Sequence, residues 1–172
     1  MTKRSFPPLV GTRVVALVLG SLPGERSLAV NEYYGHPRNR FWQVIARVTG
    51  ESLPVTYDEK KSLLDRAGIA LWDVVREATR DGSLDSAIRD EIPNEIPRFI
   101  TDHPSLQLII FNGQKPAALF KKHFPTPPGI PLVTLPGTSP ANAACHLDNL
   151  CRAWGGALLP CLRDDITGKM AR

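Results

Sequence analysis

Four short apolar runs, separated by segments with a helical pattern, restrict the fold of this chain more than any other feature. Their sequences are VVALVLG, GIALWDVV, LQLIIFNG and IPLVTLPG, at residues 14–20, 68–75, 106–113 and 130–137. Nearly continuous runs rich in valine, isoleucine and leucine are typical of strands buried on both faces. We therefore predict a strand within each run, with the second run giving the weakest signal.

The segments between these runs contain amphipathic helical patterns. In RFWQVIARVTG, residues 40–50, apolar side chains recur at the spacing of one helix face, and a glycine ends the pattern. Similar patterns cover residues 58–68, 114–124 and 147–162. Strands that alternate with helices favour a parallel sheet covered on both faces. The predicted fold class is α/β, a three-layer α/β/α sandwich around a central, mainly parallel four-stranded sheet.

The rest of the chain is less informative about the fold. Residues 78–99 are polar and lack a strong period, so we predict loops with a short helical piece there. A length of 172 residues suits a single domain, and residues 1–12 are predicted to be a poorly ordered extension of it. No apolar run approaches the ~20 residues that span a bilayer, and no targeting signal is recognisable. We expect a monomeric, cytoplasmic protein without a membrane partner.

Cysteine usage and charge narrow the choice of cofactors and partners. The chain has three cysteines, Cys145, Cys151 and Cys161, and no two of them are spaced as C-x-x-C. In a reducing compartment this favours free thiols. An iron–sulfur cluster would need four thiolates, so we predict neither a cluster nor a metal site. The net charge of +4 and the pI of about 9.1 are a mild indication of a polyanionic partner.

Three of the predicted strands end in loops of unusual composition: GSLPGERS, FNGQKP and LPGTSPANAA, at residues 20–27, 111–116 and 135–144. Ligands of open parallel sheets bind at the carboxyl ends of the strands, so we expect a binding site where these loops meet. In the first loop, Gly20 and Gly24 allow a ligand to approach the backbone closely. The lysine and Ser/Thr of a phosphate-binding P-loop are absent, and a tight strand-to-helix turn is the alternative interpretation.

At this point the sequence resembles a known family. GSLPGERSLAVNEYYGHPRNRFW, residues 20–42, is similar to the first motif of the uracil-DNA glycosylase superfamily, a G-x-x-P-G loop followed by an aromatic residue and, in some branches, H-P-x-N-x-F-W. LWDVVREATRDGSLDSAI, FNG and LPGTSPANAA resemble the hypoxanthine-DNA glycosylase branch, or family 6. The resemblance covers most of residues 14–145 in the right order. It implies a monofunctional DNA glycosylase without a cofactor.

The resemblance also implies roles for individual residues. Asn39, in the H-P-x-N element, matches the catalytic asparagine that orients the attacking water. The mismatch-specific branch has its catalytic asparagine at the position of Leu22, which carries no hydrogen-bonding group. Tyr34 matches the aromatic residue on which the flipped base stacks, and Asn112 matches the asparagine that hydrogen-bonds the base. The first loop supplies the remaining base-binding candidates, Gly20, Ser21 and Leu22.

The second motif departs from the superfamily pattern. A histidine often precedes S-P there, whereas Gly137 and Thr138 stand in that neighbourhood, so the histidine that would stabilise the departing base is absent. The usual bulky wedge after S-P is replaced by Ala141 and Asn142, which become the wedge candidates. Ser139 followed by proline is typical of a helix start, whose N–H groups bind phosphates. The candidates for contacts with the DNA backbone are Gly24, Ser139, Arg38 and Arg40.

The residues themselves leave structural alternatives open. Asn39 directly precedes a predicted helix, where asparagine is a favoured N-cap. Tyr34 could be an ordinary half-buried tyrosine, and Asn112 could be a turn residue in an N-G dipeptide. Arg38 and Arg40 could be solvated side chains.

A single asparagine amide could recognise both of the common deaminated bases. Uracil and hypoxanthine both present a carbonyl acceptor beside a ring N–H donor, and the amide of Asn112 carries the complementary donor and acceptor. Guanine shares this edge and must be excluded by shape. We expect an enzyme that hydrolyses the N-glycosidic bond of hypoxanthine, uracil or both in DNA. The alternatives are a G·U/G·T mismatch-specific uracil-DNA glycosylase, a non-catalytic DNA lesion-binding protein of the same fold, and a nucleotide-binding module unrelated to DNA.

Overall fold

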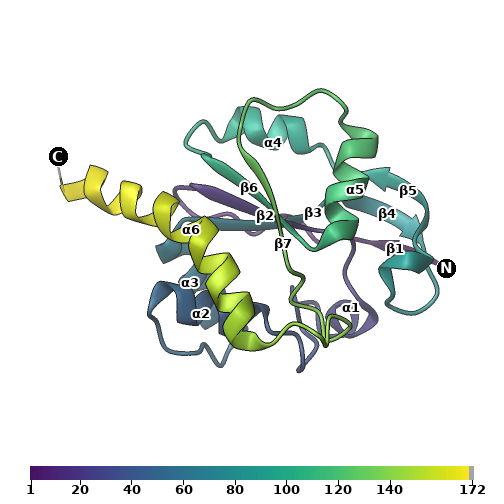
Figure 1. Ribbon diagram of the computed structural model, residues 1–172. Helices are drawn as coiled ribbons and strands as arrows, with labels where there is room; N and C mark the ends of the chain where they lie inside the picture. Colours follow the sequence, from purple (N-terminus) through teal and green to yellow (C-terminus); the bar gives the residue numbers. More distant parts are fainter. Residues whose placement is uncertain (171–172) are drawn as a thin grey trace.

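The structure, a computed structural model, describes residues 1–170, with side chains described for residues 1–162. Its central element is a four-stranded sheet in the order β3-β2-β6-β7 (Figure 1). Every neighbouring pair of strands is parallel. The strands are β2 (Ala16–Gly20), β3 (Ile69–Asp73), β6 (Leu108–Asn112) and β7 (Leu132–Leu135). The predicted α/β fold and the four predicted strands are confirmed.

Helices cover both faces of this sheet (Figure 1). The side chains of Ala16 and Val18 pack with one group of helices, and those of Leu17 and Leu19 pack with the other. The first group comprises α2 (Phe41–Thr49), α3 (Tyr57–Ala67) and α6 (Leu147–Met170). The second comprises α4 (Ile96–Asp102) and α5 (Gln114–His123), while α1 (Glu25–Val30) follows β2. The three-layer arrangement follows from strands that are apolar on both faces.

Local signals in the sequence explain where α3 begins and ends. The side chain of Thr56 accepts the N–H of Glu59, whose carboxylate accepts the N–H of Thr56, so the pair forms a capping box. Gly68 ends the helix in the left-handed conformation, with φ of +73°. The predicted helical segments over 40–50, 58–68, 114–124 and 147–162 therefore correspond to α2, α3, α5 and α6.

A second sheet, three-stranded and antiparallel, was not predicted. Its order is β1-β4-β5, and its strands are β1 (Thr2–Arg4), β4 (Val75–Thr79) and β5 (Arg89–Pro93). The prediction of loops over residues 78–99 is therefore wrong for the parts that form β4 and β5. Exposed positions interrupt the buried ones in β4, and β5 has no fully buried position, so no continuous apolar run marks either strand. The short helical pieces in this region are a 3₁₀ turn, η1 (Asp85–Ala87), and the start of α4.

The N-terminal residues also differ from the poorly ordered extension predicted for residues 1–12. Thr2 pairs with Thr79 and Arg4 with Glu77, so β1 satisfies the backbone groups along one edge of β4. Further along, Leu9 forms an isolated bridge with Leu71. These contacts attach the first residues of the chain to both sheets.

The cysteines show no arrangement for a metal. Cys145, Cys151 and Cys161 are half-buried and pack against the cluster that contains α2 and α6. Within the described residues, no three His, Cys, Asp or Glu side chains are grouped so as to hold a metal ion. No helix in the described part of the chain is long and apolar enough to cross a membrane.

Candidate active site

The carboxyl ends of three strands bring one row of residues to the same edge of the sheet. Gly20 pairs with Asp73, and Asn112 follows Phe111, which pairs with Leu19. Side chains alternate between the two faces of a sheet, so Asp73 and Asn112 point to the same face, with Gly20 between them. The absence of a side chain at Gly20 makes room for Oδ1 of Asp73 and the hydroxyl of Tyr34, which lie 2.6 Å and 3.2 Å from the position that a Cβ would take.

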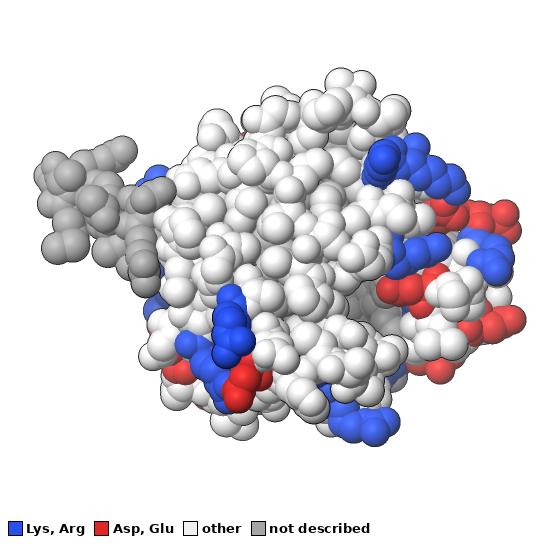
Figure 2. Space-filling model, viewed as in Figure 1, with Lys and Arg blue, Asp and Glu red and all other residues white. Residues whose placement is uncertain are grey.

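A cavity of about 750 Å³ lies over this row. In the view of Figure 2, the surface is hollowed between its uncharged central part and a group of charged side chains. Every predicted site residue other than the two arginines lines the cavity: Gly20, Ser21, Leu22, Gly24, Tyr34, Asn39, Asn112, Ser139, Ala141 and Asn142. The three loops that the sequence singled out therefore do meet at one place.

A chain of hydrogen bonds joins Asn39 to Asn112 through Thr138. The hydroxyl of Thr138 donates to Oδ1 of Asn39 (2.9 Å) and accepts from Nδ2 of Asn112 (3.0 Å). The N–H of Thr138 donates to Oδ1 of Asn112 (2.9 Å), and the N–H of Phe41 donates to Oδ1 of Asn39 (3.0 Å). Thr138 is fully buried. It connects the two amides. The sequence analysis named Thr138 only as one of the residues that stand where the superfamily often has a histidine, and assigned it no role.

These bonds fix the orientation of both amides. A backbone N–H can only donate, so Asn39 and Asn112 must each turn Oδ1 toward one. Nδ2 of Asn39 is left to face the cavity, while Asn112 keeps one N–H and one oxygen lone pair. The alternative role of Asn39 as a helix N-cap is partly present. Arg40 occupies the N-cap position of α2, but Oδ1 of Asn39 accepts the N–H of Phe41, the first residue of the helix.

Tyr34 forms a wall of the same cavity. Its ring stacks on that of Phe41, with centroids 4.3 Å apart and planes at 29°. Its φ of 51° lies in the left-handed region, which few residues other than glycine adopt. The buried hydroxyl makes no hydrogen bond of regular geometry among the described residues, and burial, reinforced by the charge of Asp73 and opposed by the nearby amide of Asn112, raises the pKa of Tyr34. The side chain is thus half-buried, as one interpretation expected, and also faces the cavity, as the other expected.

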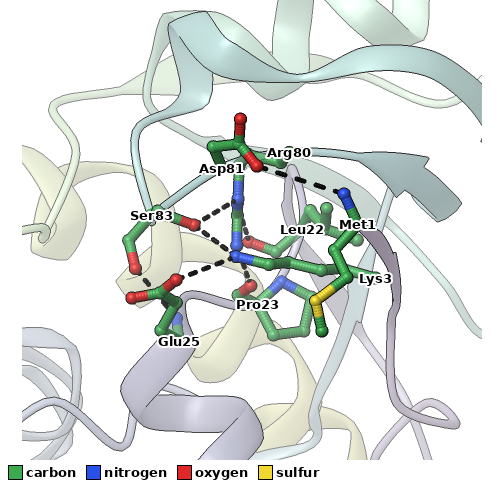
Figure 3. A network of polar contacts seen from close by, with 9 residues as sticks. Met1, Lys3, Leu22, Pro23, Glu25, Arg80, Asp81 and Ser83 are labelled. Atoms are coloured by element: carbon green, nitrogen blue, oxygen red, sulfur yellow. Dashed lines mark hydrogen bonds and ion pairs between the residues drawn. The ribbon is translucent and has the colours of Figure 1, made fainter.

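A buried arginine that the sequence interpretation missed binds backbone carbonyl oxygens of the G-x-x-P-G loop. Arg80, which directly follows β4, is only 1% exposed. Its guanidinium donates to the carbonyl oxygens of Leu22 (3.4 Å) and Pro23, as Figure 3 shows. It also donates to the carbonyl oxygen of Gly82 (3.0 Å). Nζ of Lys3 donates to the same Gly82 oxygen (2.5 Å). The second sheet therefore shapes the G-x-x-P-G loop through a network of polar contacts.

The loop after β7 differs from its prediction. The helix start predicted at Ser139 is wrong, because α6 begins only at Leu147. The segment closes a turn instead, in which the N–H of Asn142 donates to the carbonyl oxygen of Ser139 (3.0 Å) and that of Ala141 to its Oγ (3.2 Å). Backbone N–H groups that were expected to face phosphate are thus partly used within the loop.

The two arginines that flank Asn39 lie in different environments. Arg40 was a candidate for DNA contact, but its guanidinium donates to the carbonyl oxygens of Ser139 (3.3 Å), Asn142 (3.0 Å) and Cys145. That expectation is corrected: Arg40 fastens the loop after β7 to the start of α2. Arg38 is exposed.

Asp73 lines the cavity and was also missed by the sequence interpretation. It is 4% exposed, and its Oδ2 is buried without a hydrogen-bond partner among the described residues. Burial, reinforced by the charge of Asp85 and opposed by that of Arg80, raises the pKa of Asp73 to about 7. Asp85 itself accepts a hydrogen bond from Oγ of Ser21 (2.5 Å). Asp73 is the last residue of β3, as Asn112 is of β6, but in the sequence it lies inside an apolar run that continues with two valines.

The raised pKa of Asp73 predicts a pH-dependent stability. Its native pKa of about 7 exceeds the ordinary value of 3.8, so the native state binds the proton more tightly than the unfolded state. The stabilisation is complete below about pH 4 and is lost as the pH rises through 7, with an upper limit of about 4 kcal/mol. We expect the free energy of unfolding of the wild type, relative to Asp73→Asn, to fall between pH 5 and pH 8. Urea denaturation of both proteins measures this, and a constant difference would show an unperturbed carboxyl.

Comparison with known families places this geometry in context. A model of the uracil DNA glycosylase superfamily matches residues 7–154. The chain belongs to this superfamily. Two relatives named hypoxanthine DNA glycosylase, from Methanosarcina barkeri and Methanosarcina acetivorans, are each 40% identical over 116 residues, which cover 67% of this chain and 73% of theirs.

A solved structure agrees with the assignment to the uracil DNA glycosylase superfamily. The solution NMR structure of a candidate uracil DNA glycosylase from Methanosarcina acetivorans has a TM-score of 0.79 and 33% sequence identity, and the match covers 94% of this chain and 99% of that one. Together with the named relatives, the superfamily establishes a monofunctional DNA glycosylase, a hydrolase of N-glycosyl bonds that acts in DNA repair.

Proposed function

We propose that the enzyme removes hypoxanthine, and also uracil, from DNA by hydrolysing the N-glycosidic bond of a flipped-out nucleotide and leaving an abasic site. The observation that carries this proposal is the hydrogen-bonded chain Asn39–Thr138–Asn112 on the wall of the cavity. The names of the two relatives that are 40% identical support the choice of hypoxanthine.

In this proposal Tyr34 and Asn112 hold the base. Extruding a base from the duplex costs a few kcal/mol, and least for a mispaired base. Stacking on an aromatic ring returns roughly 1–3 kcal/mol, and the ring face of Tyr34 opposite Phe41 supplies that surface. Asn112, whose amide cannot flip while it is bonded to Thr138, offers its remaining N–H to a carbonyl and its remaining lone pair to a ring N–H. Adenine and cytosine present the reverse pattern, which would leave buried polar groups unpaired.

Asn39 positions the attacking water. Its Nδ2 donates to one lone pair of the water, which leaves the other lone pair for attack on C1′ of the sugar. An amide is too weak a base to remove a proton early in the reaction. Orienting the water without deprotonating it is sufficient if the glycosidic bond breaks first. The resulting oxocarbenium-like state needs only an oriented water and favourable electrostatics.

The rim of the cavity supplies the DNA contacts. Gly24, Ser139 and Arg38 remain the candidates for the phosphate backbone. Ala141 is exposed at the rim, whereas the carboxamide of Asn142 donates to the carbonyl oxygen of Gly137 (2.9 Å). Ala141 is therefore the better wedge candidate.

The mismatch-specific alternative has less support. In that interpretation the third position of the G-x-x-P-G loop acts on water, and Leu22 there is 6% exposed and has no polar group.

One assay tests the proposed function. Oligonucleotides that contain hypoxanthine, uracil, xanthine or a thymine mismatch are incubated with the enzyme, and abasic sites are then cleaved by alkali. We expect scission at hypoxanthine, with uracil second. Absence of scission at hypoxanthine, under conditions where a mismatch substrate is cleaved, would replace the proposal by the mismatch-specific activity.

A further inference from the structure

Asp73 and Asn112 lie on opposite sides of Gly20, and the hydroxyl of Tyr34 lies close to the glycine between them. The registers place both residues in the row of Gly20, one on each neighbouring strand. Strands lie about 4.8 Å apart in a sheet, so the two side chains start roughly 10 Å from each other. A Cβ added at Gly20 would lie 2.6 Å from Oδ1 of Asp73 and 3.2 Å from the hydroxyl of Tyr34. The glycine therefore allows Asp73 to face the cavity floor.

The surroundings of Asp73 favour a neutral carboxyl that can release a proton. It is 4% exposed, and its Oδ2 has no hydrogen-bond partner among the described residues. A structural aspartate of this burial is normally paired, so an unpaired one that lines a cavity indicates a ligand. The titratable groups that act on Asp73 are Tyr33, Tyr34, Arg80 and Asp85, and the other charged or titratable residues that line the cavity are Glu25, Arg26, His36 and Lys115.

A purine leaving group differs from uracil in what it can accept. Hypoxanthine has two unprotonated ring nitrogens outside the edge that Asn112 would bind, N3 and N7. Uracil has no unprotonated ring nitrogen once its N1 is bound to the sugar and its N3 carries hydrogen. Full proton transfer to a ring nitrogen can therefore assist a departing purine, whereas uracil offers only weakly basic carbonyl oxygens that accept a hydrogen bond.

We propose that Asp73 is the general acid of the reaction, protonating N3 or N7 of the departing purine. This inference rests on the proposed function. The bond between C1′ and N9 breaks, and its electron pair stays with the base. The proton of the Asp73 carboxyl passes to the ring nitrogen, so that neutral hypoxanthine leaves. The oxygen of the water forms the new bond to C1′, and the proton that it loses restores the carboxyl of Asp73.

This assignment fills a gap in the site. Gly137 and Thr138 occupy the neighbourhood of the missing histidine, and the hydroxyl of Thr138 is already committed to Asn39. Asn112 can donate a hydrogen bond but has no proton to transfer at neutral pH. Of the groups at the floor of the cavity, Asp73 combines burial, an unpaired oxygen and a native pKa of about 7, which is suited to acid catalysis near neutral pH.

The test compares wild type with Asp73→Asn, which keeps the shape and a hydrogen-bond donor but has no transferable proton. Single-turnover excision is measured on DNA that contains hypoxanthine, 7-deazahypoxanthine, 3-deazahypoxanthine or uracil. We expect Asp73→Asn to slow hypoxanthine excision by about 10²-fold or more and to leave uracil excision within a few-fold. One of the two deaza analogues lacks the nitrogen that Asp73 protonates. The wild type should excise that analogue slowly, and Asp73→Asn should excise it no more slowly than the wild type does.

The pH profile gives a second readout that a structural role would not move. The wild-type rate on hypoxanthine should decline as the pH rises above about 7, and the rate of Asp73→Asn should lack this decline. Equal losses on hypoxanthine and uracil, or a variant with full activity on hypoxanthine, would overturn the inference. Failure of the wild type to release hypoxanthine would instead refute the proposed function, so the two failures are distinguishable.

Discussion

The Asn39→Ser variant is expected to fold normally and to lose excision activity by about 10²- to 10³-fold. The serine Oγ can accept the N–H of Phe41, as Oδ1 of Asn39 does at 3.0 Å, so the start of α2 keeps its partner. The variant has no Nδ2 to orient a water, and positioning is the contribution that an amide makes to this reaction. Single-turnover assays on hypoxanthine DNA measure the loss, and thermal denaturation measures the fold.

A matched variant separates the two roles of Asn39. Asn39→Ala removes both the acceptor for the N–H of Phe41 and the amide, so it should match the serine variant in activity but be less stable by about 1 kcal/mol. Full activity in Asn39→Ser would reject the assignment of Asn39 as the residue that positions water.

Removal of the Thr138 hydroxyl should also lower activity strongly. Thr138→Val keeps the volume of the side chain but breaks the bonds to Oδ1 of Asn39 and Nδ2 of Asn112. Loss of this support should lower the excision rate by about 10²-fold, because small displacements of positioned groups are costly. The free energy of unfolding should fall by about 1–3 kcal/mol, since Nδ2 of Asn112 loses its buried acceptor.

Thr138→Ser is the control for this effect. The serine retains the hydroxyl and loses only a methyl group, so its excision rate should stay within a few-fold of wild type, although about 1 kcal/mol of stability is lost. If the valine variant were as active as the serine variant, the hydrogen-bonded chain would have no part in the reaction.

The sequence predicted the central sheet well because β2, β3 and β6 are almost entirely buried on both faces. Such strands appear as apolar runs, and glycines mark the ends of α2 and α3. The second sheet could not be recognised in this way, because β4 and β5 are partly exposed, and β1, which pairs with β4, lies far away in the sequence. A strand of this kind is defined by its neighbour rather than by its own composition.

The candidate site was predicted in its location but not in its internal contacts. The rule for parallel sheets and the family resemblance together placed Asn39, Tyr34 and Asn112 on one cavity, as the structure shows. Neither could show that Arg40 turns inward, because an arginine beside a motif looks the same whether it binds phosphate or carbonyl oxygens. Asp73 escaped notice because it sits within an apolar run and acquires its role only through burial.

The route from the N-terminus to the cavity has a practical consequence for handling the protein. The carbonyl oxygen of Met1 accepts the N–H of Arg80 (3.3 Å), and Lys3 reaches Gly82, so the outermost residues brace the arginine that shapes the G-x-x-P-G loop. Removal of residues 1–4 would eliminate both contacts and disturb a support of the cavity. These residues are therefore best kept when catalytic rates are compared.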